Sequence, residues 1–189
     1  TGTLLVPPVP FEQLTRYGYR DLEAVMRRLR APGGCPWDRE QTHITLKKDL
    51  LEESYEVLDA IDSGDDAALC EELGDLLLQC VFHAEIARGQ GRFTGRDVST
   101  GIVRKMVYRH PHIFADAEAA DSEAVLKRWD ELKKEEKHYE TQTDVLRAVP
   151  RNLPALIRAE KVQKRAARVG FDWPDIDGAL PKITEELHE

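Results

Sequence analysis

Apolar residues recur at helical spacing along almost the whole chain, and segments that alternate apolar and polar residues are scarce. This pattern predicts α-helices separated by short breaks that contain glycine, proline or aspartate. The expected fold class is therefore all-α, an antiparallel helical bundle. The first helix is expected from Leu14 or Tyr17 to Arg30, and the others cover about residues 42–62, 65–88, 94–109, 122–138 and 154–169.

Two segments are expected without helix: "APGGCPWD" after the first helix and "HPHIF" after the fourth. Residues that favour helix starts or form capping boxes accompany several predicted helices. These starts are expected at Asp65, at Thr94 with Asp97, at Ser122 and at Pro154.

The chain divides into an N-terminal arm (residues 1–16), a main helical domain (17–139), a polar linker (140–153) and a C-terminal segment (154–189). "GFDWPDIDGALPKITEELHE" in the last segment echoes "GCPWDREQTHITLKKDLLEESYE" in the main domain. Chance recurrence of EExxE in acidic helices is the alternative, but the matching tryptophan context favours a repeat. The C-terminal segment is thus interpreted as the start of a second, truncated copy.

Composition and charge exclude several classes of protein. The 189 residues are 41% hydrophobic and carry a net charge of −8, which disfavours non-specific nucleic-acid binding. No apolar run reaches membrane-spanning length, and the opening residues lack a secretory signal. The first residue is not Met, which suggests processing or a piece of a longer chain. Three cysteines without a CxxC pair favour a reducing cytoplasm.

The second predicted helix places an acidic residue in its apolar face. Leu46, Leu50, Val57 and Ala60 define that face, and Glu53 falls inside it, with Glu56 at its edge. A purely solvated acidic face would not have this arrangement. Since a buried carboxylate is costly unless a charge or a metal compensates it, Glu53 is a candidate metal ligand.

The third predicted helix repeats the situation, with Glu72 and Asp75 among apolar neighbours. Glu53/Glu56 and Glu72/Asp75 are both i, i+3 pairs, so each pair occupies one helix face. The short "DSGD" break makes the helices antiparallel, and four facing oxygen donors suit Mg²⁺ or Mn²⁺. Gly74 is expected to let a ligand or helix approach closely. The alternative is two ordinary solvated acidic faces.

These motifs occur in the order "GGCPWDREQTHITLKKDLLEESYEVLDAID", "CEELGDLLLQCVFHAEIA", "GRF" and "KMVYRHPHIFAD". Over roughly residues 18–137 the chain resembles the MazG family of nucleoside triphosphate pyrophosphohydrolases, of the all-α NTP pyrophosphatase superfamily. The resemblance implies hydrolysis of a nucleoside triphosphate to a nucleoside monophosphate and pyrophosphate. It also implies a homodimer that completes the bundle, and tandem domain copies. Because the chain stops before a second ExxD, activity is expected from the first copy.

The resemblance also implies roles for individual residues. Mg²⁺ would be held by Glu53, Glu56, Glu72 and Asp75, and Glu52, which borders this set, is our choice of general base. Lys105, Arg109 and Lys133 would contact phosphates, and Trp129 would pack near the base or sugar; solvated surface is the alternative for each cation. Trp37 either lines the nucleotide pocket or pins its loop to the bundle. His110 and His112 are interpreted as loop-packing residues, because two histidines alone make a poor zinc site.

Two alternatives to this function stay open. The chain could be a dUTP/dCTP or phosphoribosyl-ATP pyrophosphatase of the same superfamily. It could instead be a catalytically weak helical regulatory module, as the truncated second copy suggests. The expected partners are the nucleotide substrate and a second copy of the chain, without nucleic acid or membrane.

Overall fold

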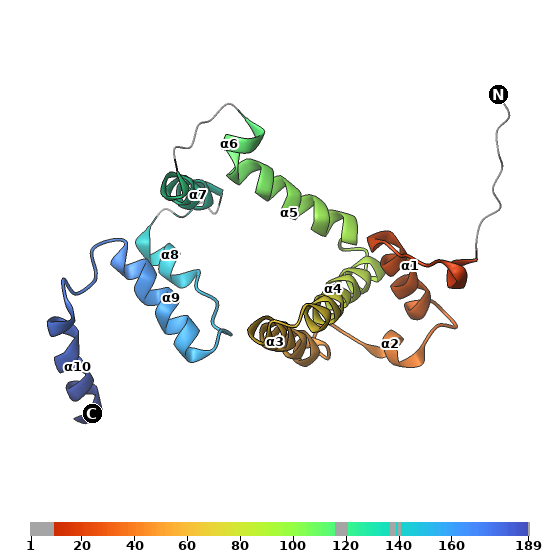
Figure 1. Ribbon diagram of the computed structural model, residues 1–189, viewed down its shortest axis with the longest axis horizontal. Helices are drawn as coiled ribbons and strands as arrows, with labels where there is room; N and C mark the ends of the chain where they lie inside the picture. Colours follow the sequence, from red (N-terminus) through yellow and green to blue (C-terminus); the bar gives the residue numbers. More distant parts are fainter. Residues whose placement is uncertain (1–9, 116–120, 137–138, 140, 189) are drawn as a thin grey trace. The chain divides into compact units, whose positions relative to one another are not determined.

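The computed structural model describes residues 10–115, 121–136, 139 and 141–188 (Figure 1). The described residues form helices and no strand, which confirms the all-α fold class. They divide into two compact units, one ending at Met106 and the other beginning at Val107, and each unit is considered by itself.

The first unit contains a short 3₁₀ turn and most of the long helices. After Phe11–Gln13 come α1 (Tyr19–Arg30), α2 (Pro36–Glu40), α3 (Lys47–Ser63), α4 (Asp66–Gly89) and α5 (Gly95–Arg109), of which α5 continues into the second unit. The second unit also holds α6 (Pro111–Phe114), α7 (Ser122–Glu136), α8 (Gln142–Arg147), α9 (Ala155–Ala167) and α10 (Ile176–His188).

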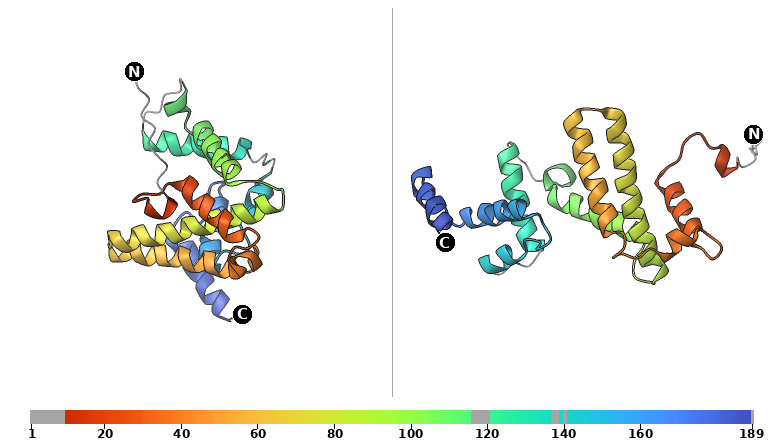
Figure 2. Two further views of the ribbon diagram at one scale, coloured as in Figure 1. Left: turned by 90° about the vertical axis from the view of Figure 1, so that its right-hand side faces the viewer. Right: turned by 90° about the horizontal axis from the view of Figure 1, so that it is seen from below.

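Helices α3 and α4 form an antiparallel hairpin, and both views of Figure 2 show them side by side. Gly64 ends α3 in the left-handed conformation (φ 69°), which glycine adopts without steric cost. Asp65 then caps α4, its carboxylate accepting hydrogen bonds from the backbone N–H groups of Ala67 and Ala68. The predicted break therefore produces the tight reversal that brings the two acidic helices together.

The core of the first unit lies where α1 and the segment before α3 meet the second half of α4. Helix α1 packs against α4. The buried cluster consists of Met26, Leu46, Val81, Phe82 and Ile86. Burial of this apolar surface fixes α4 as the central helix of the unit. The first half of α4, which carries the acidic residues, extends beyond this core along α3.

The loop after α1 is held tightly. Gly34 is required there, since a Cβ atom would lie 2.2 Å from the carbonyl oxygen of Leu29. Arg30 donates to the backbone oxygens of Asp38 and Gln41 and lies over the ring of Phe82, 5.4 Å from its centroid. These contacts tie the "APGGCPWD" segment to α4.

The structure corrects three local predictions. "APGGCPWD" and "HPHIF" were expected without helix, yet α2 and α6 begin there, because Pro36 and Pro111 occupy first helical positions. Ser122 was expected to cap the fifth predicted helix, but it lies inside α7. The capping contact comes instead from Asp121, whose carboxylate accepts from the N–H of Ala124 at 2.8 Å. The predicted end of that helix near His138 lies outside the described residues.

Other predicted ends agree with the structure. Thr94 and Asp97 form the expected reciprocal capping contacts, and Pro154 precedes α9. Most of the predicted N-terminal arm lies outside the described residues, as does Glu189 at the end of the second EExxE motif. The predicted linker (140–153) contains α8, and the domain boundaries stay predictions. Within the described part of the chain, no helix is both long and apolar enough to cross a membrane.

Candidate metal centre

Three predicted ligands meet on the α3–α4 hairpin. Glu53 and Glu56 from α3 and Glu72 from α4 each offer a carboxylate oxygen, and these oxygens all lie within 4.8 Å of one another. Glu53 and Glu72 are half-buried and Glu56 is exposed. The i, i+3 spacing places Glu53 and Glu56 on the face that α4 covers. The arrangement offers hard oxygen donors from two helices to one small volume.

Asp75, the fourth predicted ligand, follows Glu72 by one turn of α4 but does not belong to this close group. Burial is the largest cause of the raised pKa of Glu53, and the charge of Asp75 is the second. Asp75 also contributes to the raised pKa of Glu72. Asp75 is therefore an electrostatic neighbour of the three carboxylates. The structure brings the four acids together, with Asp75 at the edge of the group.

Crowding disfavours the charged forms of these carboxylates. Burial is the largest cause of the raised pKa of Glu53, and Asp75, Glu56 and Glu72 add repulsion. Burial also leads the rise in the pKa of Glu72, followed by the charges of Glu56 and Asp75. A divalent cation among these oxygens would offset the repulsion, so the donor set and its electrostatics fit a metal such as Mg²⁺ or Mn²⁺.

Gln79 belongs to this centre and was missed in the sequence. It lies four residues after Asp75 on α4, and only 7% of its surface is exposed. A hydrogen bond from its side chain stabilises the Glu53 carboxylate and opposes the rise in pKa. The i, i+4 spacing from Asp75 was the available signal, since it places both side chains on one helix face.

Glu52 and Gly74 differ from the rest of the predicted site. Glu52, our candidate general base, lies outside the close carboxylate group, and its Oε2 is 3.6 Å from Nζ of Lys48. Its role stays a prediction. A Cβ atom at Gly74 would meet no described atom within 4 Å, so no neighbouring helix approaches closely enough to require glycine there.

Comparison with known proteins identifies the fold that carries this centre. Residues 41–114, which include the whole carboxylate group, match the model of the MazG nucleotide pyrophosphohydrolase domain. The crystal structure of a MazG-related protein from Thermotoga maritima is 32% identical, with a TM-score of 0.51 over 61% of this chain and 97% of that one. The chain belongs to the MazG family.

Longer members of the MazG family are also similar. The nucleoside triphosphate pyrophosphohydrolase of Escherichia coli K12 is 50% identical over 169 residues, which cover 89% of this chain and 64% of that protein. The nucleoside triphosphate pyrophosphohydrolase/pyrophosphatase MazG of Thermotoga maritima is 44% identical over 171 residues, 90% of this chain and 65% of that protein. The chain thus spans just under two thirds of these relatives.

The residues that the MazG resemblance assigns to substrate binding fall in both units. Lys105 is half-buried near the end of the first unit. In the second unit Arg109 is buried, and its Nε and Nη2 donate to the Glu136 carboxylate at 2.9 and 2.5 Å. Its guanidinium lies 5.5 Å from the centroid of the Trp129 ring. Two residues that the resemblance assigns to the substrate, Arg109 and Trp129, therefore lie next to each other.

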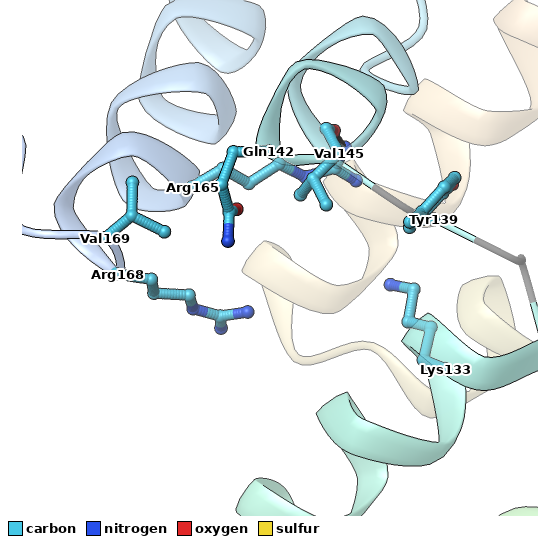
Figure 3. A pocket seen from close by; sticks show the side chains of 7 residues that line it. All are labelled: Lys133, Tyr139, Gln142, Val145, Arg165, Arg168 and Val169. Atoms are coloured by element: carbon cyan, nitrogen blue, oxygen red, sulfur yellow. Dashed lines mark hydrogen bonds between the residues drawn. The ribbon is translucent and has the colours of Figure 1, made fainter.

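Lys133 lines a small cavity of about 50 Å³ in the second unit. In Figure 3 the ends of Lys133 and Arg168 both point toward the middle of this cavity, while the side chain of Arg165 extends toward Val145. Arg165 itself donates to the backbone oxygen of Val145. Lys133, which is predicted to contact phosphate, thus shares its cavity with Arg165 and Arg168. The sequence interpretation did not include these two residues in the site.

Trp37 and His110 both make contacts with another aromatic ring. The Trp37 ring meets Phe82 edge-on, with centroids 6.3 Å apart, and 58% of Trp37 stays exposed. This contact fits the loop-pinning interpretation and leaves a face available to a ligand. The His110 ring packs edge-on against Trp129, with centroids 4.8 Å apart, as expected of a loop-packing residue.

Proposed function

We propose that this chain is a Mg²⁺-dependent nucleoside triphosphate pyrophosphohydrolase that releases a nucleoside monophosphate and pyrophosphate, and so removes unwanted nucleotides. The observation that carries the proposal is the group of three carboxylate oxygens within 4.8 Å of one another on α3 and α4. The names of the relatives from Escherichia coli and Thermotoga maritima support the same reaction.

In the proposed site, Glu53, Glu56 and Glu72 hold the metal, with Asp75 as the fourth acid. Bound Mg²⁺ would neutralise phosphate charge and make a water molecule more acidic. The contribution of the protein is to gather anionic oxygens before the substrate arrives, so that little reorganisation remains. Glu52 is exposed, with Nζ of Lys48 3.6 Å from its Oε2, and we assign to it the acceptance of a proton from water.

The triphosphate also needs cationic contacts, and we assign them to Lys105, Arg109 and Lys133. Arg109 is held in place by Glu136, which fixes the plane of its guanidinium. An oriented guanidinium presents its remaining N–H donors in a defined direction, which suits phosphate oxygens. Trp129, under the same guanidinium, is proposed to pack near the base or sugar.

Product analysis with a panel of nucleotides tests the proposal. Ribo- and deoxyribonucleoside triphosphates are incubated with the protein and Mg²⁺, and the products are separated by ion-exchange chromatography. Monophosphate and pyrophosphate are expected, whereas orthophosphate without pyrophosphate would contradict the proposal. A Glu53→Ala, Asp75→Ala double variant should lose the activity. Asp59→Ala, an exposed acid elsewhere on α3, is the matched control and should retain it.

The same panel separates the alternatives within the superfamily. Strong preference for dUTP or dCTP, or turnover of phosphoribosyl-ATP, would redefine the substrate without changing the metal centre. Absence of turnover with every nucleotide, despite metal binding, would favour the regulatory-module alternative.

A homodimer is part of the proposal. Large apolar side chains remain exposed on both helices of the hairpin, and a partner would cover them. They are Leu51, Tyr55, Leu58, Ile61, Leu73 and Leu77. Sedimentation equilibrium tests this, and a monomer at micromolar concentration would contradict it. We also propose a cytoplasmic location, which suits the three free cysteines.

A further inference from the structure

Two buried polar atoms on α4 lack hydrogen-bond partners among the described residues: Oε1 of Gln79 and Nε2 of His83. Such atoms are rare in folded proteins because each forfeits its hydrogen bonds to water. Gln79 and His83 are four residues apart, so their side chains lie one above the other on the same face of the helix. This face also carries Asp75, one turn before Gln79.

The contacts of His83 determine which of these atoms is a donor. Its Nδ1 lies 2.8 Å from Nδ1 of His43, and the two rings are stacked with centroids 5.1 Å apart. Arg92 approaches Nε2 of His43 through its guanidinium, which can only donate. Nε2 of His43 must therefore accept, and the proton of a neutral His43 lies on its Nδ1.

The same rule then applies to the second ring. Because His43 donates through Nδ1, Nδ1 of His83 accepts, and a neutral His83 carries its proton on Nε2. Burial lowers the pKa of His83, with a smaller contribution from His43, which favours this neutral form. The buried Nε2–H group of His83 is thus a donor without a partner, one helical turn from Gln79, whose Oε1 is an acceptor without a partner.

We propose that one bound water joins these two atoms, and that His83 and Gln79 are positioning residues for Glu53. The inference deepens the proposed function, because it rests on Glu53 as a metal ligand. The water accepts from His83 and donates to Gln79, whose amide N–H donates to the Glu53 carboxylate. The complete chain of hydrogen bonds runs from Arg92 through His43, His83, the water and Gln79 to Glu53.

Such a chain has a defined physical effect. An amide held at its oxygen cannot rotate to present that oxygen to Glu53, so the N–H donor always faces the carboxylate. A fixed donor orients a metal ligand, and loss of such outer contacts weakens metal affinity. Gln79 and His83 would thus act on the metal through Glu53, without touching the substrate.

The tautomers provide the first test, which requires neither metal nor nucleotide. Long-range ¹H–¹⁵N correlation spectra of the whole chain report which imidazole nitrogen carries a proton. We expect His83 protonated at Nε2 and His43 protonated at Nδ1. The opposite tautomer at His83 would overturn the inference, because its Nε2 could then no longer donate toward Gln79.

Mn²⁺ binding without nucleotide provides the second test, with free Mn²⁺ measured by electron paramagnetic resonance. Gln79→Met keeps the length of the side chain but removes the amide, and should weaken Mn²⁺ binding by about 10-fold. His83→Phe keeps a ring but removes the donor, and should weaken binding by a smaller factor than Gln79→Met, because His83 acts on Glu53 only through Gln79. Cys80→Ser, at an exposed neighbour of Gln79, is the matched control and should bind as the unaltered chain does.

The double variant tests whether the two residues act together. In the Gln79→Met background, His83→Phe should cause no further loss of Mn²⁺ affinity, since the chain is already interrupted. An equal loss in both backgrounds would overturn the inference, as would unchanged affinity in Gln79→Met. Both readouts are independent of turnover, so failure of the proposed reaction would be seen separately in the product analysis.

Discussion

Carboxylate oxygens of Glu53 on α3 and Glu72 on α4 lie within 4.8 Å of one another, across the hairpin that reverses at Gly64. Their pKa values are raised, first by burial and then by neighbouring acids. At neutral pH the metal-free fold therefore holds like charges together at a cost in stability. The metal centre and the hairpin are therefore coupled.

Glu53→Gln should stabilise the metal-free protein. The substitution keeps the shape and the acceptor for Gln79 but removes one of the crowded charges. Because solvent screens these partly exposed charges, the gain should stay below about 1 kcal/mol, which corresponds to a rise in the melting temperature in EDTA of about 1–2 °C. Differential scanning fluorimetry measures it. Asp59→Asn, at an exposed position on the same helix, is the control, and an equal rise there would contradict the explanation.

Metal should stabilise the unaltered chain in proportion to its occupancy. A ligand present at about 100 times its dissociation constant stabilises the native state by about 2.7 kcal/mol. Titration with Mg²⁺ should therefore raise the melting temperature. Above the dissociation constant, the stabilisation should grow with the logarithm of the Mg²⁺ concentration. The Glu53→Ala, Asp75→Ala variant should lose this response while keeping its helical circular dichroism. If that variant still responded to Mg²⁺, the stabilising metal would bind at another site.

Loss of the carboxylate at Glu136 should destabilise the second unit. Arg109 is almost fully buried, and Glu136 receives hydrogen bonds from its Nε and Nη2. Glu136→Gln removes the compensating charge, so we expect the free energy of unfolding to fall by about 1–3 kcal/mol. Urea denaturation measures it. Glu131→Gln breaks the exposed pair with Arg128 on α7 and should cost less than about 1 kcal/mol.

Acidification should weaken the fold through His83. Its folded pKa lies below the unfolded value of 6.5, so the unfolded chain binds the proton more readily. The stability that neutral His83 contributes is present above pH 6.5 and is lost as the pH falls through the folded pKa. Melting temperatures between about pH 8 and about pH 5 should fall more steeply for the unaltered chain than for His83→Phe. Parallel curves would contradict this prediction.

Local sequence patterns predicted the helices that carry the site. The break before Asp65 and the position of Glu53 inside an apolar face were sufficient to propose that α3 and α4 turn acidic residues toward each other. The short helices α2 and α6 escaped prediction because Pro36 and Pro111, which break a longer helix, also begin short ones. Asp121 and Ser122 are both good capping residues, and composition does not choose between them.

The parts of the site that involve distant residues could not be predicted in this way. Gln79 shares a helix face with Asp75, but only the packing of α3 on α4 makes it a donor to Glu53. His43 and His83 are far apart in the sequence, and their stacking follows from the way the segment before α3 closes over α4. No local pattern specifies such a contact, because it depends on how separate elements pack.

The sequence by itself determined the all-helical fold, the hairpin and the residue types of the metal centre, because helical periodicity and turn chemistry act over a few neighbouring residues. Only the tertiary structure decided which acids meet within 4.8 Å and that Asp75 lies at their edge. It also decided that Oε1 of Gln79 and Nε2 of His83 are buried without a hydrogen-bond partner among the described residues. Burial and desolvation arise from packing between helices, and they give these side chains their altered chemistry.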